Sequence, residues 1–360
     1  MKRFCWLILL FAACLFAHAQ TEIGELNHAQ FRIDVPEQWN HGLVVYFHGY
    51  TPDPVTYQQE PLKPELAVFV KAGYALVQSG YSKGGWAVEQ AVPETEALRQ
   101  YFIKKYGAPK ETYVTGHSMG GLLTMMSIEE SPDSYDGGLA LCGALADTAE
   151  MMQRYAFDGR VMFDYYFPSA LPSPVRVPAD FKMDDALSKR IQGELDRKPQ
   201  AAATLRRILG AHSNQDLAAG LVFATYILKD AQQRAEGNPF DNRNTIYAGT
   251  ANDNALNDGV RRYAADPGAL NYLQRYYTPS GRLTRPLLAI HTTYDPVVPP
   301  PILEAYSLLT RQRGSAKLFV QQYVKHDGHC NIKPEEIDRG FSELRRWQKT
   351  GERPSPGGLH

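Results

Sequence analysis

The sequence predicts an α/β fold with a mostly parallel, doubly wound sheet. Short apolar runs alternate with segments of helical spacing up to about residue 144, and the same alternation returns after residue 286. Between them, residues 147–280 show helical spacing without a convincing buried strand. Strands that alternate with helices form parallel sheets with right-handed crossovers, so the chain reads as one sheet domain interrupted by a helical insertion.

The first half supplies most of the predicted sheet. Residues 31–35 alternate like a half-exposed strand, whereas 43–47 and 74–77 are continuous apolar runs, as expected for strands buried on both faces. Further predicted strands are 112–115, which is β-branched, and 138–142. The helices predicted between the strands are 66–72, 88–106 and 121–130.

The second half completes the predicted organisation. Helical segments at 184–195 and 200–209 lie in the insertion, strands at 286–291 and 317–323 follow it, and a final helix spans 335–349. We therefore expect an α/β core from residues 20–146 and 281–350, with a lid or cap from 147–280. The Pro- and Gly-rich residues 351–360 are expected to form a flexible tail.

The N-terminus has the pattern of a secretory signal peptide. Lys2 and Arg3 precede an apolar run at 4–16, and Ala17-His18-Ala19 resembles a cleavage site. The run is shorter than the roughly 20 apolar residues of a membrane span. We expect cleavage near Ala19 and a secreted or periplasmic protein without a stable membrane span; an uncleaved anchor or lipidation at Cys14 are the alternatives.

The net charge argues against a nucleic-acid-binding protein, and the cysteine content of the cleaved chain limits the possible disulfides to one. The 38 basic and 39 acidic side chains give a formal charge of −1, so no global field favours nucleic acid. No feature specifies an oligomeric state. After cleavage only Cys142 and Cys330 remain, either as one disulfide of an oxidising compartment or as two buried thiols.

The strongest chemical signal is Gly116-His117-Ser118-Met119-Gly120-Gly121, between a predicted strand and a predicted helix. A G-x-S-x-G motif on such a turn exposes the serine hydroxyl above the sheet, with glycines where a Cβ would not fit. Ser118 is therefore the candidate nucleophile.

A serine nucleophile needs a base and a carboxylate that orients the base. Asp295 follows the strand at 286–291, and His329 follows the strand at 317–323. The carboxyl ends of parallel strands share one edge, which would bring Ser118, Asp295 and His329 together. Asp147 is an alternative acid and His326 an alternative base.

A metal site is the competing interpretation of the histidine segment. His326 and His329 could ligate an ion together with Asp327 and Cys330, but no second cluster completes a ligand set. We therefore predict neither a metal nor an organic cofactor.

Four segments resemble the α/β-hydrolase superfamily, in particular secreted serine esterases and prolyl-oligopeptidase-like hydrolases. They are the elbow at 116–121, the His48-Gly49 turn, the Asp295-Pro296-x-Val298-Pro299 loop and the Gly328-His329 pair. The resemblance implies an α/β-hydrolase fold with a helical lid. It also implies an oxyanion hole from the backbone N–H groups of Met119 and Tyr50, with Thr51 as the alternative to Tyr50.

Aromatic and methionine residues are dense from Met151 to Phe167, where the insertion begins. Such residues above a catalytic crevice often line a substrate pocket, although they can equally form the core of the lid itself. The segment from Tyr81 to Trp86 is a further candidate for the rim. The predicted substrate-binding residues are Tyr155, Phe163, Tyr166 and Phe167.

The sequence therefore predicts a secreted serine hydrolase that cleaves a small-molecule or polymer-linked carboxylic ester through an acyl-enzyme. A serine peptidase of the prolyl-oligopeptidase-like type is the alternative enzyme. A catalytically inactive binding protein on the same fold is the alternative from another class.

Overall fold

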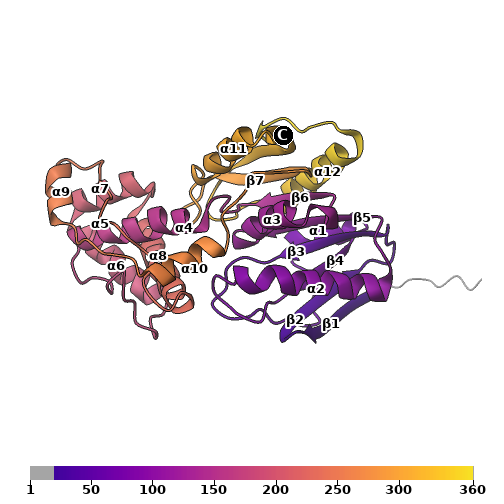
Figure 1. The fold of residues 1–360 in the computed structure, drawn as a ribbon, viewed down its shortest axis with the longest axis horizontal. Helices are drawn as coiled ribbons and strands as arrows, with labels where there is room; N and C mark the ends of the chain where they lie inside the picture. Colours follow the sequence, from indigo (N-terminus) through magenta and orange to yellow (C-terminus); the bar gives the residue numbers. More distant parts are fainter. Residues whose placement is uncertain (1–19, 360) are drawn as a thin grey trace, which may run out of the picture.

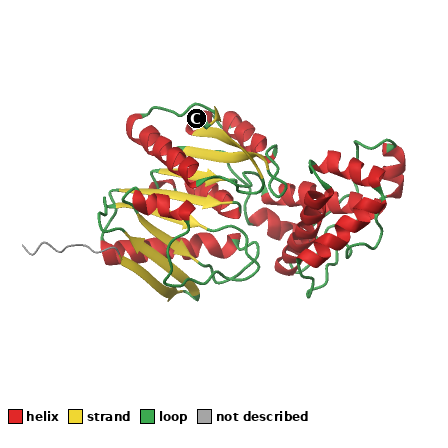
Figure 2. Ribbon diagram, turned by 180° about the vertical axis from the view of Figure 1, so that it is seen from behind, coloured by secondary structure: helices red, strands yellow, loops and turns green. Residues whose placement is uncertain are grey.

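The computed structural model describes residues 20–359, and the predicted signal peptide at 1–19 lies outside this range. The described chain forms one nine-stranded sheet with helices on both faces, and a group of helices stands beside the carboxyl end of the sheet (Figure 1; Figure 2). None of the helices in this range is long and apolar enough to cross a membrane.

The strands follow the order β1-β2-β4-β3-β5-β6-β7-β8-β9 across the sheet. The pairs β1–β2 and β2–β4 are antiparallel and all other neighbours are parallel. The bounds are β1 Gln20–Leu26, β2 Ala29–Val35, β3 Gly42–Phe47, β4 Ala75–Ser79, β5 Glu111–His117, β6 Gly137–Leu141, β7 Leu287–Tyr294, β8 Phe319–Asp327 and β9 Gly357–Gly358.

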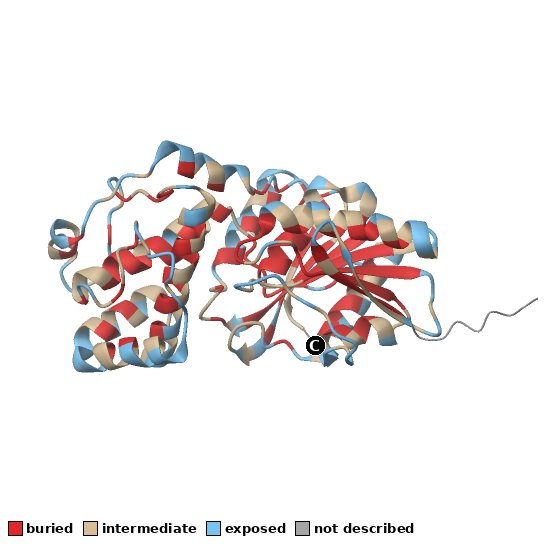
Figure 3. Ribbon diagram, turned by 90° about the horizontal axis from the view of Figure 1, so that it is seen from below, coloured by how far each residue is buried: buried red, intermediate tan, exposed pale blue. Residues whose placement is uncertain are grey.

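Helices cover both faces of the sheet, which leaves the central strands fully buried (Figure 3). One apolar cluster includes residues of α1 and α12, and a second includes residues of α2, α3 and α11. Continuous apolar strands are stable in such a sheet because neither face meets water. These helices are α1 Pro64–Lys71, α2 Val88–Tyr106, α3 Met119–Glu130, α11 Ile302–Gln312 and α12 Pro334–Thr350, and short 3-10 turns span Pro132–Ser134 and Ala316–Leu318.

The helical insertion lies between β6 and β7. Within the described chain, the stretch between Leu141 and Leu287 contains helices and no strand. We refer to this group as the cap. Its elements are α4 Thr148–Met151, a π-helical turn Met152–Asp158, α5 Gly159–Tyr166, α6 Asp185–Arg197, α7 Pro199–Leu209, α8 Asn214–Arg234, α9 Asp253–Gly259 and α10 Pro267–Arg275.

The C-terminal segment differs from the predicted flexible tail at 351–360. Strand β9 pairs in parallel with β8, and the N–H of Leu359 donates to the carbonyl of Tyr323 at 2.9 Å. Pro354 is buried. Backbone hydrogen bonds to a sheet edge do not require an apolar pattern, which explains why composition suggested fraying here.

The carboxylate of Glu129 joins the cap to the sheet domain. Glu129 near the end of α3 accepts hydrogen bonds from the hydroxyl groups of Tyr277 and Tyr306, at 3.1 and 2.7 Å. It also accepts from the backbone N–H groups of Ser280 and Gly281, at 2.6 and 2.7 Å. One side chain therefore holds the segment that returns from the cap against both α3 and α11.

Replacing Glu129 with alanine should lower the free energy of unfolding by about 2–4 kcal/mol, because buried donors lose a charged acceptor. Urea unfolding measures the change. The matched control is Glu130→Ala, since Glu130 is exposed and accepts no hydrogen bond from the described residues. Equal effects of the two substitutions would contradict the role given to Glu129.

Candidate active site

The turn between β5 and α3 holds Ser118 in an unusual backbone conformation. Its φ and ψ are 58° and −120°, a region that non-glycine residues seldom adopt. The turn is also tight: a Cβ on Gly120 would lie 2.1 Å from the carbonyl oxygen of Phe47. The G-x-S-x-G segment therefore forms a strained strand-to-helix corner that projects the Ser118 side chain above the sheet.

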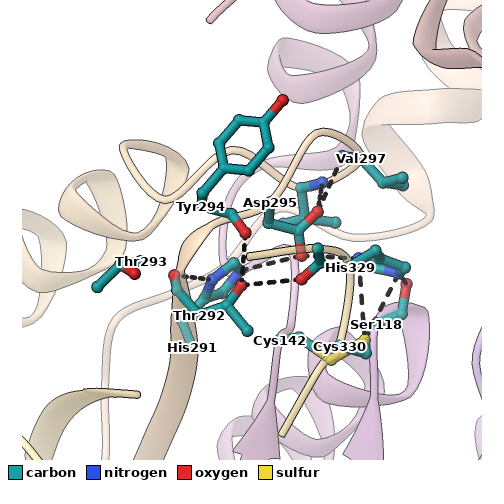
Figure 4. A network of polar contacts seen from close by, with 12 residues as sticks. Ser118, Cys142, His291, Thr292, Thr293, Tyr294, Asp295, Val297, His329 and Cys330 are labelled. Atoms are coloured by element: carbon teal, nitrogen blue, oxygen red, sulfur yellow. Dashed lines mark hydrogen bonds and ion pairs between the residues drawn. A yellow bond between two sulfur atoms is a disulfide. The ribbon is translucent and has the colours of Figure 1, made fainter. Parts of the chain in front are cut away.

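Ser118, His329 and Asp295 form a continuous line of hydrogen bonds (Figure 4). Nε2 of His329 lies 2.9 Å from Oγ of Ser118, and Nδ1 lies 2.7 Å from Oδ2 of Asp295. The three residues follow β5, β8 and β7, parallel strands whose carboxyl ends lie at one edge of the sheet, with β6 between β5 and β7. When Nδ1 donates to the carboxylate, the lone pair of Nε2 faces the serine hydroxyl.

The surroundings of Asp295 keep its carboxylate ionised. Its Oδ1 accepts from the N–H groups of Val297 and Val298 at 2.8 and 2.9 Å, and the residue is only 2% exposed. Burial acts to raise the pKa of this carboxyl, but the hydrogen bond and charge of His329 and the two N–H groups outweigh it. The net effect holds the pKa of Asp295 below its usual range.

Three further histidines lie near Ser118, His329 and Asp295: His48 in the predicted oxyanion turn, His117 in the elbow, and His291, for which the sequence predicted no place in the site. Burial lowers the pKa of His48 and of His117 to about 4. Burial also lowers the pKa of His291, whose Nε2 lies 3.9 Å from Oδ2 of Asp295. These imidazoles are therefore neutral at neutral pH, and His329 is the imidazole that contacts the serine hydroxyl.

Two backbone segments lie against Ser118 where an oxyanion hole is predicted. Met119 is the first residue of α3, so its N–H has no acceptor within the helix. This N–H forms no hydrogen bond to the described residues. The other segment contains Gly49 and Tyr50. A Cβ on Gly49 would lie 3.3 Å from Cβ of Ser118, a tight contact, so the glycine eases the close approach of the two segments. Thr51 instead pairs with Gly85 in a β-bridge.

The alternative acid and base lie elsewhere. Asp147 is the N-cap of α4 and accepts from the N–H of Glu150 at 2.9 Å. Nε2 of His326 is 2.9 Å from Oε1 of Glu336. Among residues 20–359, no three His, Cys, Asp or Glu side chains lie close enough to hold a metal ion together.

Cys142 and Cys330 form a disulfide, so the structure contains the bonded alternative. Cys142 follows β6 and Cys330 follows His329 directly, at a sequence separation of 188. Sγ of Cys330 lies 3.5 Å from Nε2 of His329. The bond therefore ties the histidine loop to the strand next to the serine elbow.

Replacing both cysteines with serine should lower the free energy of unfolding by about 3–5 kcal/mol, because the bond closes a long loop. It should also lower kcat by about 10- to 100-fold, since the loop that holds His329 loses its attachment. Urea unfolding and turnover of an ester measure the two effects, and reduction of the native protein is the control. Two free thiols in the unreduced, denatured protein would contradict the bond.

A pocket of about 1000 Å³, counting the part open to solvent, adjoins Ser118. Apolar side chains of the cap and of the loop after β7 form most of its wall. Helix α8 crosses it and contributes residues at helical spacing. Its lining includes Tyr50, Trp86, Met151, Met152, Tyr155, Asp216, Leu217, Leu221, Phe223, Val297, Val298 and Ile302.

Of the predicted substrate-binding residues, only Tyr155 lines this pocket. Phe163 and Phe167 are buried and stack on each other with ring centroids 5.1 Å apart, so they belong to the core of the cap. The ring of Tyr166 packs edge-on against Tyr165, also away from the pocket. Aromatic density alone did not reveal which helix face meets the serine.

Residues 25–268 match the family model described as "Tannase-like family of unknown function (DUF6351)", which is more than half of the chain. The chain belongs to this tannase-like family. A search of curated proteins finds no match for it.

Solved structures confirm the predicted α/β-hydrolase fold of this tannase-like protein. The acylaminoacyl peptidase of Pyrococcus horikoshii matches 96% of this chain with a TM-score of 0.50 at 13% identity, and the match covers 44% of the peptidase. This chain therefore spans less than half the length of that enzyme.

Two esterases match at lower TM-scores. Pf2001 of Pyrococcus furiosus has a TM-score of 0.48 at 13% identity, covering 91% of this chain and 90% of the esterase. Est1E of Butyrivibrio proteoclasticus has a TM-score of 0.47 at 13% identity, covering 90% and 98%.

Proposed function

We propose that this protein is a serine hydrolase that cleaves carboxylic esters through an acyl-enzyme. The observation that carries the proposal is the line of hydrogen bonds from Asp295 through His329 to Ser118, beside a largely apolar pocket. The tannase-like description of the family and the esterases and peptidase among the similar structures agree with this class of chemistry.

The first half of the reaction transfers the acyl group to the enzyme. Nε2 of His329 accepts the proton of Ser118 while Oγ attacks the ester carbonyl carbon. The resulting oxyanion accepts hydrogen bonds from the N–H groups of Met119 and Tyr50. His329 then gives its proton to the leaving alcohol, and the bond between the carbonyl carbon and the alcohol oxygen breaks. Asp295 stabilises the imidazolium that forms between these steps.

The second half releases the acid. Water enters the place of the alcohol, His329 accepts one of its protons, and the hydroxide attacks the acyl carbon. The second tetrahedral intermediate collapses, the bond to Oγ of Ser118 breaks, and His329 returns the proton to the serine. Each proton therefore passes through the same imidazole, and the enzyme ends in its starting state.

We also propose that the protein acts outside the cytoplasm after removal of residues 1–19. The disulfide supports this proposal, because such bonds persist in oxidising compartments. N-terminal sequencing of the exported protein should begin at Gln20.

A substrate panel tests the ester chemistry against the peptidase alternative. We expect turnover of p-nitrophenyl esters of increasing chain length and of aryl esters, with a prolyl amide cleaved much more slowly. Faster cleavage of the amide than of every ester would favour a peptidase. No turnover of any substrate, together with no reaction of Ser118 with an organophosphonate, would contradict the proposed function.

A further inference from the structure

The pocket beside Ser118 has two unlike ends along helix α8. Near the start of α8, Gly220 faces the loop after β7. A Cβ on Gly220 would lie 3.7 Å from the carbonyl oxygen of Pro296. Further along, Phe223 packs edge-on against Tyr50 with ring centroids 5.7 Å apart, and the carboxylate of Asp230 accepts from the backbone N–H of Trp86 at 2.6 Å. The first end is lined by aliphatic and methionine side chains: Met151, Leu217, Val297, Val298 and Ile302.

The second end holds two unused hydrogen-bond donors. The hydroxyl of Tyr50 and Nε1 of Trp86 are both buried, and neither has a partner among the described residues. Both residues line the pocket beside Ser118. Leaving such a group unpaired costs about 1–3 kcal/mol, and two of them in one pocket call for a ligand.

The surrounding charges indicate what that ligand is. Burial and the nearby carboxylate of Asp230 raise the pKa of Tyr50, so its phenol keeps the proton that it can donate. The indole N–H of Trp86 is a donor only. Asp216 is the only charged side chain that lines the pocket within the described chain, and it lies at the aliphatic end, next to Leu217. At the end that holds Tyr50 and Trp86, the carboxylate of Asp230 pairs with Arg234 at 3.1 Å, so the positive charge of Arg234 is balanced and does not favour an anionic group. The group that fits is therefore an uncharged hydrogen-bond acceptor.

We propose that Tyr50 and Trp86 donate hydrogen bonds to a neutral oxygen of the substrate, a hydroxyl, ether or carbonyl oxygen outside the scissile ester group. This assignment rests on the proposed ester hydrolysis and specifies its substrate class. The enzyme then prefers esters that carry such an oxygen on one side of the scissile bond, while the aliphatic end of the pocket takes the hydrocarbon part on the other side.

Matched pairs of esters that exchange one methylene for oxygen test the assignment. On the acyl side the pair is p-nitrophenyl pentanoate and p-nitrophenyl 3-methoxypropanoate, and on the alcohol side it is butyl acetate and 2-methoxyethyl acetate. Each kcat/KM is divided by the hydroxide-catalysed rate of the same ester, which removes differences in intrinsic reactivity. We expect the oxygen ester to be favoured by about 5- to 50-fold in one of the pairs.

Variants identify the donors. Tyr50→Phe keeps the backbone N–H and removes only the hydroxyl, and Trp86→Phe removes the indole N–H. Each should reduce the preference for the oxygen ester by about 2- to 10-fold. Tyr226→Phe is the matched control, because Tyr226 packs edge-on against Tyr50 with ring centroids 6.1 Å apart but does not line the pocket. It should leave the ratio unchanged.

Three results would overturn the assignment while leaving ester hydrolysis intact. They are equal normalised rates within both pairs for the native enzyme, an unchanged ratio in the folded Tyr50→Phe variant, or faster hydrolysis of p-nitrophenyl hemisuccinate than of the methoxy ester. Absence of turnover for all of these esters would instead contradict the proposed function itself.

Discussion

Replacement of Ser118 by alanine is expected to lower kcat for ester hydrolysis by about 10⁴- to 10⁶-fold. The hydroxyl is the only side-chain atom lost, and it is the atom that Nε2 of His329 approaches at 2.9 Å. Without it no acyl-enzyme forms. Steady-state kinetics on the best p-nitrophenyl ester measures the loss, with circular dichroism to show that the fold is retained.

The control is a serine behind the elbow. Ser127 on α3 is buried, and its hydroxyl donates to the carbonyl of Leu123 at 2.8 Å rather than facing the pocket. Ser127→Ala should change kcat by less than about twofold, because it touches none of the reacting atoms. A Ser118→Ala variant that retains the native rate would remove the basis of the mechanism.

Replacement of His329 by glutamine is expected to cause a loss of similar size, about 10⁴- to 10⁶-fold in kcat. Glutamine has hydrogen-bonding atoms but cannot accept and return a proton at neutral pH, so Ser118 remains a weak nucleophile. The same ester assay measures the change.

His326→Gln is the matched control for His329. The two histidines lie in the same loop region, but the imidazole of His326 pairs with Glu336 at 2.9 Å instead of with the triad. We expect a loss of less than about fivefold from this variant, caused by altered packing of the loop. A larger loss from His326→Gln than from His329→Gln would show that the base had been assigned to the wrong residue.

Much of the sheet domain was predictable from local patterns. The strand at 43–47 and the helix at 88–106 appear in the structure almost residue for residue, because continuous apolar runs and helical spacing are strong signals. The positions of Ser118, Asp295 and His329 followed from the elbow motif and from the rule that parallel strands end at one edge. With this rule, Ser118 and His329 could be placed together although 211 positions separate them in the sequence.

Other features depend on tertiary contacts that no local pattern encodes. Strand β1 is polar and lies at the sheet edge, where no apolar alternation marks it. Its hairpin turn at Asn27 and His28 has positive φ at both residues, without the glycine that usually signals such a turn.

The pocket wall shows the same limit for the candidate site. Helix α8 has apolar residues at helical spacing, such as Leu217 and Leu221, but the sequence does not show that this face covers Ser118. Phe163 on α5 and Phe167, which directly follows this helix, are buried in the cap core instead. The direction of a helix face is set by the packing of the whole cap.

Covalent labelling tests the central claim most directly. The native protein is incubated with a p-nitrophenyl phosphonate, and its mass and peptide map are measured beside those of Ser118→Ala and His329→Gln. We expect one phosphonyl group per native chain, located on Ser118, none on Ser118→Ala and a greatly slowed reaction of His329→Gln. An unlabelled Ser118 in the folded native protein, or inactivation through a different residue, would contradict the account.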